Sequence, residues 1–292
     1  MKQRLITGTC YVAALVAFFL LKIYLPYPWN FLSFDLLLWF FSVVGTFEML
    51  RALGGRMTAA ERVVALLFSL LYIPAYDVSV YAVGYDKLSV MGVSFFLVCL
   101  VFLALFVVQY EKTSLESVGC SLLACVYPTL LIGTMVLCNH LERYSDLALL
   151  FVFVISPCAD SLAYLFGISL GKKFPCKISP HISPKKTVVG CIGGIVGGVL
   201  GALILFFLYH LAAGQGIPYD TLWIYLLIGA GASVFTEFGD LVESAIKRKE
   251  GIKDMGKILP GHGGILDRID GTMYAAVLVY AVFYILIGIN VL

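Results

Sequence analysis

The sequence predicts an all-α polytopic integral membrane protein with about nine transmembrane helices. Of its 292 residues, 61% are hydrophobic and only 13% are charged, which is about half the charge of an average soluble domain. A membrane-spanning helix needs about 20 mostly apolar residues, and the chain contains nine such stretches. We place them at residues 5–25, 31–50, 62–82, 88–109, 115–138, 146–170, 188–211, 221–243 and 270–291.

Two of these stretches carry features that argue against a plain membrane helix. The first follows the residues MKQR, as in a signal peptide, but its apolar run is long and has no clear small-x-small cleavage site. We therefore expect a retained helix. The third is interrupted by Pro74 and Asp77, and we expect PAYDVSVYAVGYDK (74–87) to be an outer loop, because its tyrosines suit a membrane interface.

The distribution of basic residues predicts the orientation. If the N-terminus faces the cytoplasm, 17 of the 20 Lys and Arg residues fall on the cytoplasmic side, and only Lys22, Lys87 and Arg143 do not. Cytoplasmic loops of membrane proteins carry such an excess of Lys and Arg. With nine helices, the C-terminus then lies outside, as does the segment 210–220, which has no Lys or Arg.

Polar residues divide the chain into three regions. The first 145 residues offer little chemistry, and we expect Asp35 and Glu48 to snorkel or to cap helix ends. From Ser156 onward, charged residues recur between and within the apolar stretches. The predicted regions are 1–87 with the first three helices, 88–155 with the middle helices, and a catalytic region 156–292 with cytoplasmic loops 171–187 and 247–269.

The catalytic region opens with a carboxylate inside an apolar helix. SPCADSLAYLFG (156–167) places Asp160 just after Pro157, and such a residue is functional by default. The next segment, GKKFPCKISPHISPKKTVVGCIGG (171–194), contains five lysines. With the amides of a helix N-terminus they suit an anionic ligand. Lysine-rich loops also hold the cytoplasmic side and attract anionic lipids, so this segment alone leaves both interpretations open.

The inner end of the eighth helix, FTEFGDLVESAIKRK (235–249), carries an amphipathic stripe. At 100° per residue its polar side chains fall within a sector about 100° wide. The acids lie deep and the bases lie at the end, which would let one face hold a cation and then an anionic ligand. The members of the stripe are Glu237, Asp240, Ser244, Lys247 and Arg248.

The longest polar stretch, KRKEGIKDMGKILPGHGGILDRID (247–270), follows at once. Glycines around His262 allow the backbone to approach a ligand closely. Asp267 and Asp270 are three residues apart on one helix face. Carboxylates without a Cys or His cluster favour Mg²⁺ over Zn²⁺. Lysines, amides and acidic ligands at the cytoplasmic face indicate phosphoryl or nucleotidyl transfer, although the chain has no GxxxxGK[ST] motif.

These residues carry a resemblance to a known family. The stretch from Ser244 to Asp270 resembles the signature of phosphatidate cytidylyltransferases (CDP-diacylglycerol synthases) at every defined position. The blocks DSLAYLFG, ISPKKTVVG and GDLVESAIKR are similar to the family's other blocks, and together they cover residues 156–271. The chain departs from the family at Val188-Val189, where Trp-Glu is common.

The resemblance implies a nucleotidyltransferase of phospholipid biosynthesis that converts CTP and phosphatidic acid to CDP-diacylglycerol and pyrophosphate. It implies Mg²⁺, with the presence of a second metal ion left open, and a homodimer in the lipid bilayer. No nucleic-acid partner is expected. A bacterial cytoplasmic membrane, with the active site facing the cytoplasm, fits the short N-terminus.

The same resemblance implies roles for individual residues. Asp240, Asp267 and Asp270 would bind metal. Ser244, Lys247, Arg248, Lys253 and His262 would join the metal ligands in the catalytic centre. Substrate would be bound by Asp160, Ser161, Ser183, Lys185, Lys186, Thr187, Gly263, Gly264 and Arg268.

Two other functions stay open at the level of the sequence. Asp160, Glu237 and Asp240 could relay ions in an ion-coupled transporter. A CTP-dependent polyprenol kinase would use CTP as a phosphate donor instead. The fate of a label on the α-phosphorus of CTP separates the three functions.

Overall fold

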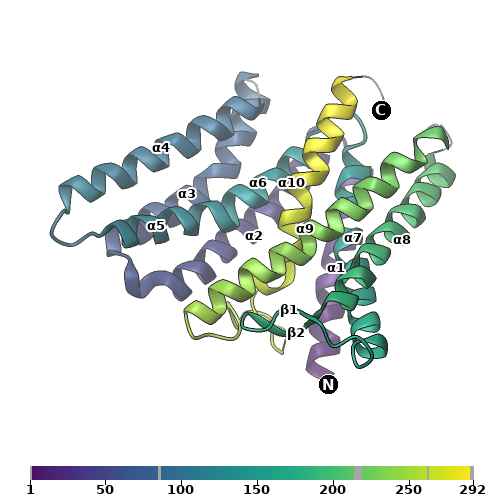
Figure 1. Ribbon diagram of the computed structural model, residues 1–292. Helices are drawn as coiled ribbons and strands as arrows, with labels where there is room; N and C mark the ends of the chain where they lie inside the picture. The colour runs from purple at the N-terminus through teal and green to yellow at the C-terminus, as the bar shows by residue number, and fades with distance from the viewer. Residues whose placement is uncertain (1, 85–86, 214–218, 262, 290–292) are drawn as a thin grey trace. The chain divides into compact units, whose positions relative to one another are not determined.

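The computed structural model describes residues 2–84, 87–213, 219–261 and 263–289 (Figure 1). Within these residues, nine helical spans are long and apolar enough to cross a membrane, which confirms the predicted fold class. Most of their ends lie within a few residues of the predicted ones. The spans are Ile6–Tyr24, Trp29–Arg56, Ala59–Val83, Val90–Val108, Leu115–Asn139, Ser145–Leu170, Val188–Leu211, Tyr219–Lys249 and Leu266–Gly288.

The chain forms two compact units. Unit 1 consists of Met1–Leu137 and Glu250–Arg268, and unit 2 of Cys138–Lys249 and Ile269–Leu292. The three predicted regions are drawn from the distribution of polar residues and not from packing, so this division stays a prediction. Unit 1 contains α1 (Lys2–Tyr24), α2 (Trp29–Leu53), the 3₁₀ turn η1 (Gly54–Arg56), α3 (Ala59–Val78), the π turn η2 (Ser79–Val83), α4 (Lys87–Val108), α5 (Leu115–Ala124), the π turn η3 (Cys125–Leu130) and most of α6 (Leu131–Asn139).

The outer loop predicted for residues 74–87 is wrong for the part that the structure describes. α3 continues through Pro74 to Val78, and η2 extends the helical path to Val83. Inside a membrane every backbone polar group needs an internal partner, so a helix that tolerates a proline is favoured over an irregular loop. Gly84 ends the path in the left-handed conformation, with φ of 74°. Residues 85 and 86 lie outside the described residues.

α3 begins at a capping box. The Thr58 hydroxyl accepts the N–H of Glu61 at 3.3 Å, and the Glu61 carboxylate accepts the N–H of Thr58 at 2.7 Å. Ser117 on α5 also donates to Glu61. Glu61 is fully buried, so a buried acid here serves to start a helix.

Unit 2 is built on three long helices that pack side by side in Figure 1, α7 (Ser145–Leu170), α8 (Val188–Ala213) and α9 (Leu222–Lys249). Their close approach follows from glycine. A Cβ on Gly198 of α8 would meet the carbonyl oxygen of Gly229 on α9, and a Cβ on Gly197 would meet the carbonyl of Cys158 on α7. Small residues let membrane helices pack at short distance. The unit also holds the strands β1 (Lys177–Ser179) and β2 (Ser183–Thr187), the turn η4 (Tyr219–Thr221) and most of α10 (Leu266–Gly288).

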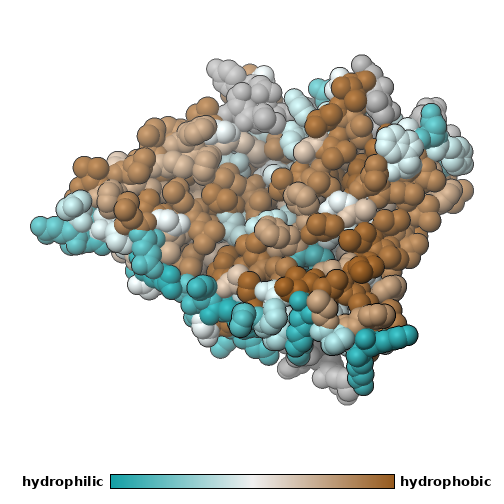
Figure 2. Space-filling model, in the orientation of Figure 1, coloured by the Kyte–Doolittle hydropathy of each residue, from teal (hydrophilic) through white to brown (hydrophobic). Residues whose placement is uncertain are grey.

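The outward faces of the helices are apolar. Figure 2 shows hydrophobic residues over most of the visible surface of the helices. By exposed fraction, Leu71 of α3 is 61% exposed and Phe238 of α9 is 57% exposed. Such surfaces suit contact with lipid chains. The predicted orientation of the termini stays a prediction.

Candidate active site

A β-hairpin brings the predicted lysines of loop 171–187 to α9. β1 pairs antiparallel with β2, with Lys177 opposite Thr187 and Ser179 opposite Ser183. Side chains alternate along a strand, so Lys185 is exposed while Lys186 turns toward the protein. Thr187 ends the strand, and its hydroxyl accepts the N–H of Gly190 at 3.1 Å, which caps α8.

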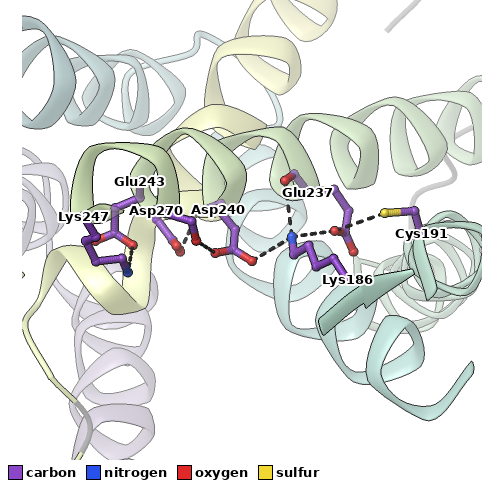
Figure 3. A network of polar contacts seen from close by, with 9 residues as sticks. Lys186, Cys191, Glu237, Asp240, Glu243, Lys247 and Asp270 are labelled. Carbon is purple, nitrogen blue, oxygen red and sulfur yellow. Dashed lines mark hydrogen bonds and ion pairs between the residues drawn. The ribbon is translucent and has the colours of Figure 1, made fainter. Parts of the chain in front are cut away.

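Lys186 is held by two carboxylates of α9. Its Nζ lies 2.7 Å from an oxygen of Glu237 and 2.7 Å from an oxygen of Asp240 (Figure 3). Burial lowers the pKa of the Lys186 amine, but the adjoining Asp240 and Glu237 outweigh this effect and raise the pKa well above its ordinary value. Lys186 therefore stays positively charged and neutralises part of the acidic face of α9.

The predicted stripe on α9 is present and is held by hydrogen bonds between successive turns. The Ser244 hydroxyl donates to Asp240 at 3.2 Å. Lys247 pairs with Glu243 at 2.7 Å, and the Glu243 side chain is fully buried. Sequence reasoning missed Glu243 because it lies just outside the predicted sector, although its position four residues before Lys247 is a usable signal.

Two further carboxylates approach the same face from other helices. Asp270 of α10 hydrogen-bonds with Glu243 and accepts the N–H of Gly271 at 2.8 Å. Asp160 of α7 lies within electrostatic reach of Asp270 and Lys186. We call the five acids the acidic cluster. It comprises Asp160, Glu237, Asp240, Glu243 and Asp270.

The acidic cluster has the chemistry of a divalent cation site. Its five carboxyl groups face the two ammonium groups of Lys186 and Lys247. Acidic groups therefore outnumber basic groups on this face. Carboxylate oxygens without thiolate or imidazole partners are the ligands that Mg²⁺ prefers. The residue types of this face are compatible with the predicted metal, whose site stays a prediction.

Three other predicted residues of unit 2 lie on the hairpin or on α7 and α9. The Ser161 hydroxyl donates to the carbonyl of Pro157 at 2.6 Å within its own helix. Ser183 pairs with Ser179 across the hairpin. Arg248 is exposed at the end of α9.

Unit 1 holds the other predicted residues in a glycine turn before α10. The N–H of Leu259 donates to the carbonyl of Gly263 at 2.9 Å and closes the turn. Gly261 and Gly263 have φ of 79° and 88°, in the region that favours glycine. The predicted site residue His262 lies outside the described residues.

Asp267 ties this turn to the start of α10. Its Oδ2 accepts the N–H of Met255 at 2.9 Å and the N–H of Gly264 at 2.8 Å. A Cβ on Gly263 would lie 2.7 Å from the same oxygen. The turn thus needs both the glycine and this side-chain oxygen of Asp267, which sequence spacing alone does not indicate.

Lys253 and Arg268 are exposed in the same unit. Lys253 lines a cavity of about 360 Å³ together with Asp254 and Lys257. Arg51 of α2 lines it too, a residue that sequence reasoning did not propose. The basic side chains make this cavity suited to an anion.

Comparison with known proteins supports the resemblance found in the sequence. The sequence pattern of the Cytidylyltransferase family matches residues 2–286. The chain is 36% identical over 281 residues to the phosphatidate cytidylyltransferase of Bacillus subtilis (strain 168), and the match covers 96% of each chain.

Shorter matches join it to two other bacterial proteins of the same name. The Thermotoga maritima protein is 41% identical over 132 residues, which cover 44% of this chain and 46% of that one. The Staphylococcus haemolyticus protein is 40% identical over 126 residues, which cover 43% and 45%. The family pattern runs over nearly the whole chain, and the Bacillus subtilis protein is similar from end to end. The chain therefore belongs to the Cytidylyltransferase family.

Proposed function

We propose that this protein is a phosphatidate cytidylyltransferase, which converts CTP and phosphatidic acid to CDP-diacylglycerol and pyrophosphate. The observation that carries the proposal is the acidic cluster with its lysines, formed by residues of the stretch 156–271 that resembles the family. Family membership and the name of the Bacillus subtilis relative support it. The comparisons lend no support to an ion-coupled transporter or to a polyprenol kinase.

The reaction is an in-line displacement at phosphorus. A phosphate oxygen of phosphatidic acid forms a bond to the α-phosphorus of CTP, and the bond from that phosphorus to the bridging oxygen of the β-phosphate breaks. Pyrophosphate leaves with the electron pair. Because a phosphate monoester has a second pKa of about 6, the attacking group is already largely a dianion. The enzyme therefore has to position and neutralise charge rather than to remove a proton.

The basic residues divide into two groups in this proposal. Lys186 and Lys247, paired with carboxylates, hold the acidic cluster in shape. Lys185, Arg248 and Lys253 are exposed and are the better candidates for contact with the phosphates of CTP and phosphatidic acid. This assignment refines the sequence-based one, which placed Lys247, Arg248 and Lys253 in the catalytic centre and gave Lys185 and Lys186 to substrate binding.

Asp240 and Asp270 are the residues of the acidic cluster that we assign to Mg²⁺, and Asp267 on the same helix as Asp270 stays a predicted ligand. When bound, the metal would neutralise negative charge on the reacting phosphates. A second metal ion is a possibility that the excess of carboxylates leaves open.

The proposed enzyme lies in a membrane, with its site on the cytoplasmic side. The positive-inside pattern supports a site that faces the cytoplasm of a bacterial cell. The apolar outer faces of the helices support a place in the lipid bilayer. The homodimer implied by the family resemblance is carried forward as an expectation.

The test is an assay with CTP labelled on the α-phosphorus. The purified protein is incubated with phosphatidic acid, labelled CTP and Mg²⁺, and the lipid phase is analysed. We expect the label to enter the lipid as CDP-diacylglycerol. Label that remains in CDP indicates a kinase, and unchanged CTP indicates a protein that is not a CTP-dependent transferase; either result overturns the proposal.

A further inference from the structure

Glu48 is a buried acid in the membrane-spanning helix α2. Glu48 is only 1% exposed, and its neighbours Phe47 and Met49 are apolar. A carboxylate in such a place is costly unless it is paired or hydrogen-bonded. The sequence interpretation of Glu48 as a capping or snorkelling residue does not say what it would cap.

The structure shows that Glu48 caps a helix more than 200 residues away in the sequence. One carboxylate oxygen accepts the N–H of Ile265 at 3.0 Å, and the other accepts the N–H of Leu266 at 2.9 Å. These N–H groups lie at the start of α10, where the helix has no acceptor of its own for them. A negative charge at this place is also favoured by the helix dipole.

Two glycines make room for the carboxylate. A Cβ on Gly256 or on Gly264 would collide with the oxygen atoms of Glu48. The backbone on both sides of the glycine turn therefore closes directly around the Glu48 side chain. The carboxylate supplies both acceptors, one oxygen to each N–H group.

Asp267 completes the arrangement from inside the turn. It accepts the N–H groups of Met255 and Gly264, while Glu48 accepts the next two N–H groups along the chain. Two carboxylates thus bind four N–H groups around one turn. Displacement of the Glu48 contacts would release the start of α10, and Asp267 is the second residue of that helix.

We propose that Glu48 is a positioning residue of the cytidylyl transfer reaction, which fixes the start of α10 and thereby the carboxylate of Asp267. This inference rests on the proposed function, in which Asp267 contributes to the charged site. Glu48 itself touches only backbone in the contacts described above. It lies outside the stretch 156–271 that carries the family resemblance.

The test compares two buried acids of unit 1. Glu48→Gln keeps the shape of the side chain but loses its charge and one of its two acceptor oxygens. Glu61→Gln is the matched control, because Glu61 is also buried and caps a different helix, α3. Glu48→Asp keeps the charge, shortens the side chain by one methylene and provides a milder second variant.

Three measurements are made on each purified protein in detergent. Hydrogen–deuterium exchange follows the peptides that cover residues 255–267, and it needs no substrate. Cytidylyl transfer gives kcat and the Mg²⁺ concentration for half-maximal rate. Thermal unfolding reports general stability.

We expect Glu48→Gln to speed exchange in residues 255–267 and to lower kcat, or raise the Mg²⁺ requirement, by about 10–100-fold, as for other residues that orient metal ligands. Glu61→Gln should leave exchange in these residues and the Mg²⁺ requirement unchanged. Glu48→Asp should fall between Glu48→Gln and the unmodified protein.

Two results overturn the inference. In the first, residues 255–267 exchange hydrogen at the same rate in both Glu48 variants as in the Glu61→Gln control. The other is faster exchange and a lower unfolding temperature with kcat and the Mg²⁺ requirement unchanged, which would make Glu48 a purely structural cap. Failure of the proposed function would look different, since the unmodified protein would then form no CDP-diacylglycerol.

Discussion

Lys186 carries the positive charge that two acids of α9, Glu237 and Asp240, share. Its raised pKa follows from this double pairing. Folding raises the pKa of Lys186, so folding favours its charged form. Its contribution to stability is therefore complete below the ordinary lysine pKa of about 10.4 and is lost only above that pH. At neutral pH the charge is therefore a permanent part of the site.

Replacing Lys186 should destabilise the protein, whereas replacing its neighbour should not. Lys186→Met leaves Glu237 and Asp240 without their shared cation. Removal of one partner of a buried pair costs about 3–5 kcal/mol. We expect the lower part of that range, because the Asp240 side chain is 35% exposed. The thermal unfolding temperature in detergent should fall by several degrees for Lys186→Met and stay unchanged for Lys185→Met.

A double variant checks the cause of this effect. Adding Glu237→Gln to Lys186→Met removes one of the two charges that were left unpaired, so part of the lost stability should return. Equal unfolding temperatures for Lys186→Met and Lys185→Met would contradict the assignment of Lys186 as a structural cation.

Asp267→Asn should abolish turnover without unfolding the glycine turn. Both N–H groups of the turn bind the same oxygen of Asp267, and the amide oxygen of an asparagine can accept both. The negative charge, in contrast, is lost. We expect a folded protein with no measurable formation of CDP-diacylglycerol and with normal hydrogen exchange in residues 255–267. Near-normal turnover would rule out a role for Asp267 as a metal ligand.

At the scale of elements, α9 shows what helical periodicity can and cannot predict. The stripe from Glu237 to Arg248 follows from a 100° rotation per residue, and the hydrogen bond from Ser244 to Asp240 joins two of its members. Periodicity does not show what faces the stripe. Glu237 pairs with Lys186 of β2, and Asp270 of α10 approaches Glu243; the periodicity of α9 reports neither contact.

α8 tests whether its glycines are needed for helix contact. A Cβ on Gly198 would collide with Gly229 and Ser233 of α9, whereas a Cβ on Gly92 of α4 would meet nothing within 4 Å. Alanine in a helix interior is otherwise favoured over glycine by about 0.5–1 kcal/mol. Gly198→Ala should therefore lower the unfolding temperature in detergent, and Gly92→Ala should leave it equal or higher. A higher unfolding temperature for Gly198→Ala would contradict the close α8–α9 contact.

At the scale of the whole molecule, composition and hydropathy predicted the class of fold and the nine spans of the described residues, because membrane helices are set by length and apolarity. The π turn after Pro74 was not predicted, since a proline signals interruption without saying how the chain repairs it. The contact between Glu48 and Leu266 joins residues 218 positions apart. No local pattern reports such a contact, so the acidic residue was visible in the sequence while its role was not.

The orientation of the whole chain can be tested by labelling single cysteines. The eight native cysteines are free and are first replaced. Cysteine is then introduced at Tyr219, which is 63% exposed before α9, or at Lys257, which is exposed after it. The 17 basic residues assigned to the inner side predict that Lys257 faces the cytoplasm and Tyr219 the outside.

A membrane-impermeant thiol reagent added to right-side-out vesicles should then label Tyr219→Cys but not Lys257→Cys. After detergent is added, both variants should be labelled, which controls for the accessibility of each site. The opposite pattern would place the glycine turn and the acidic residues of the site on the outer side, where cytoplasmic CTP does not reach. The predicted orientation therefore bears directly on function, because it decides whether the site can meet cytoplasmic CTP.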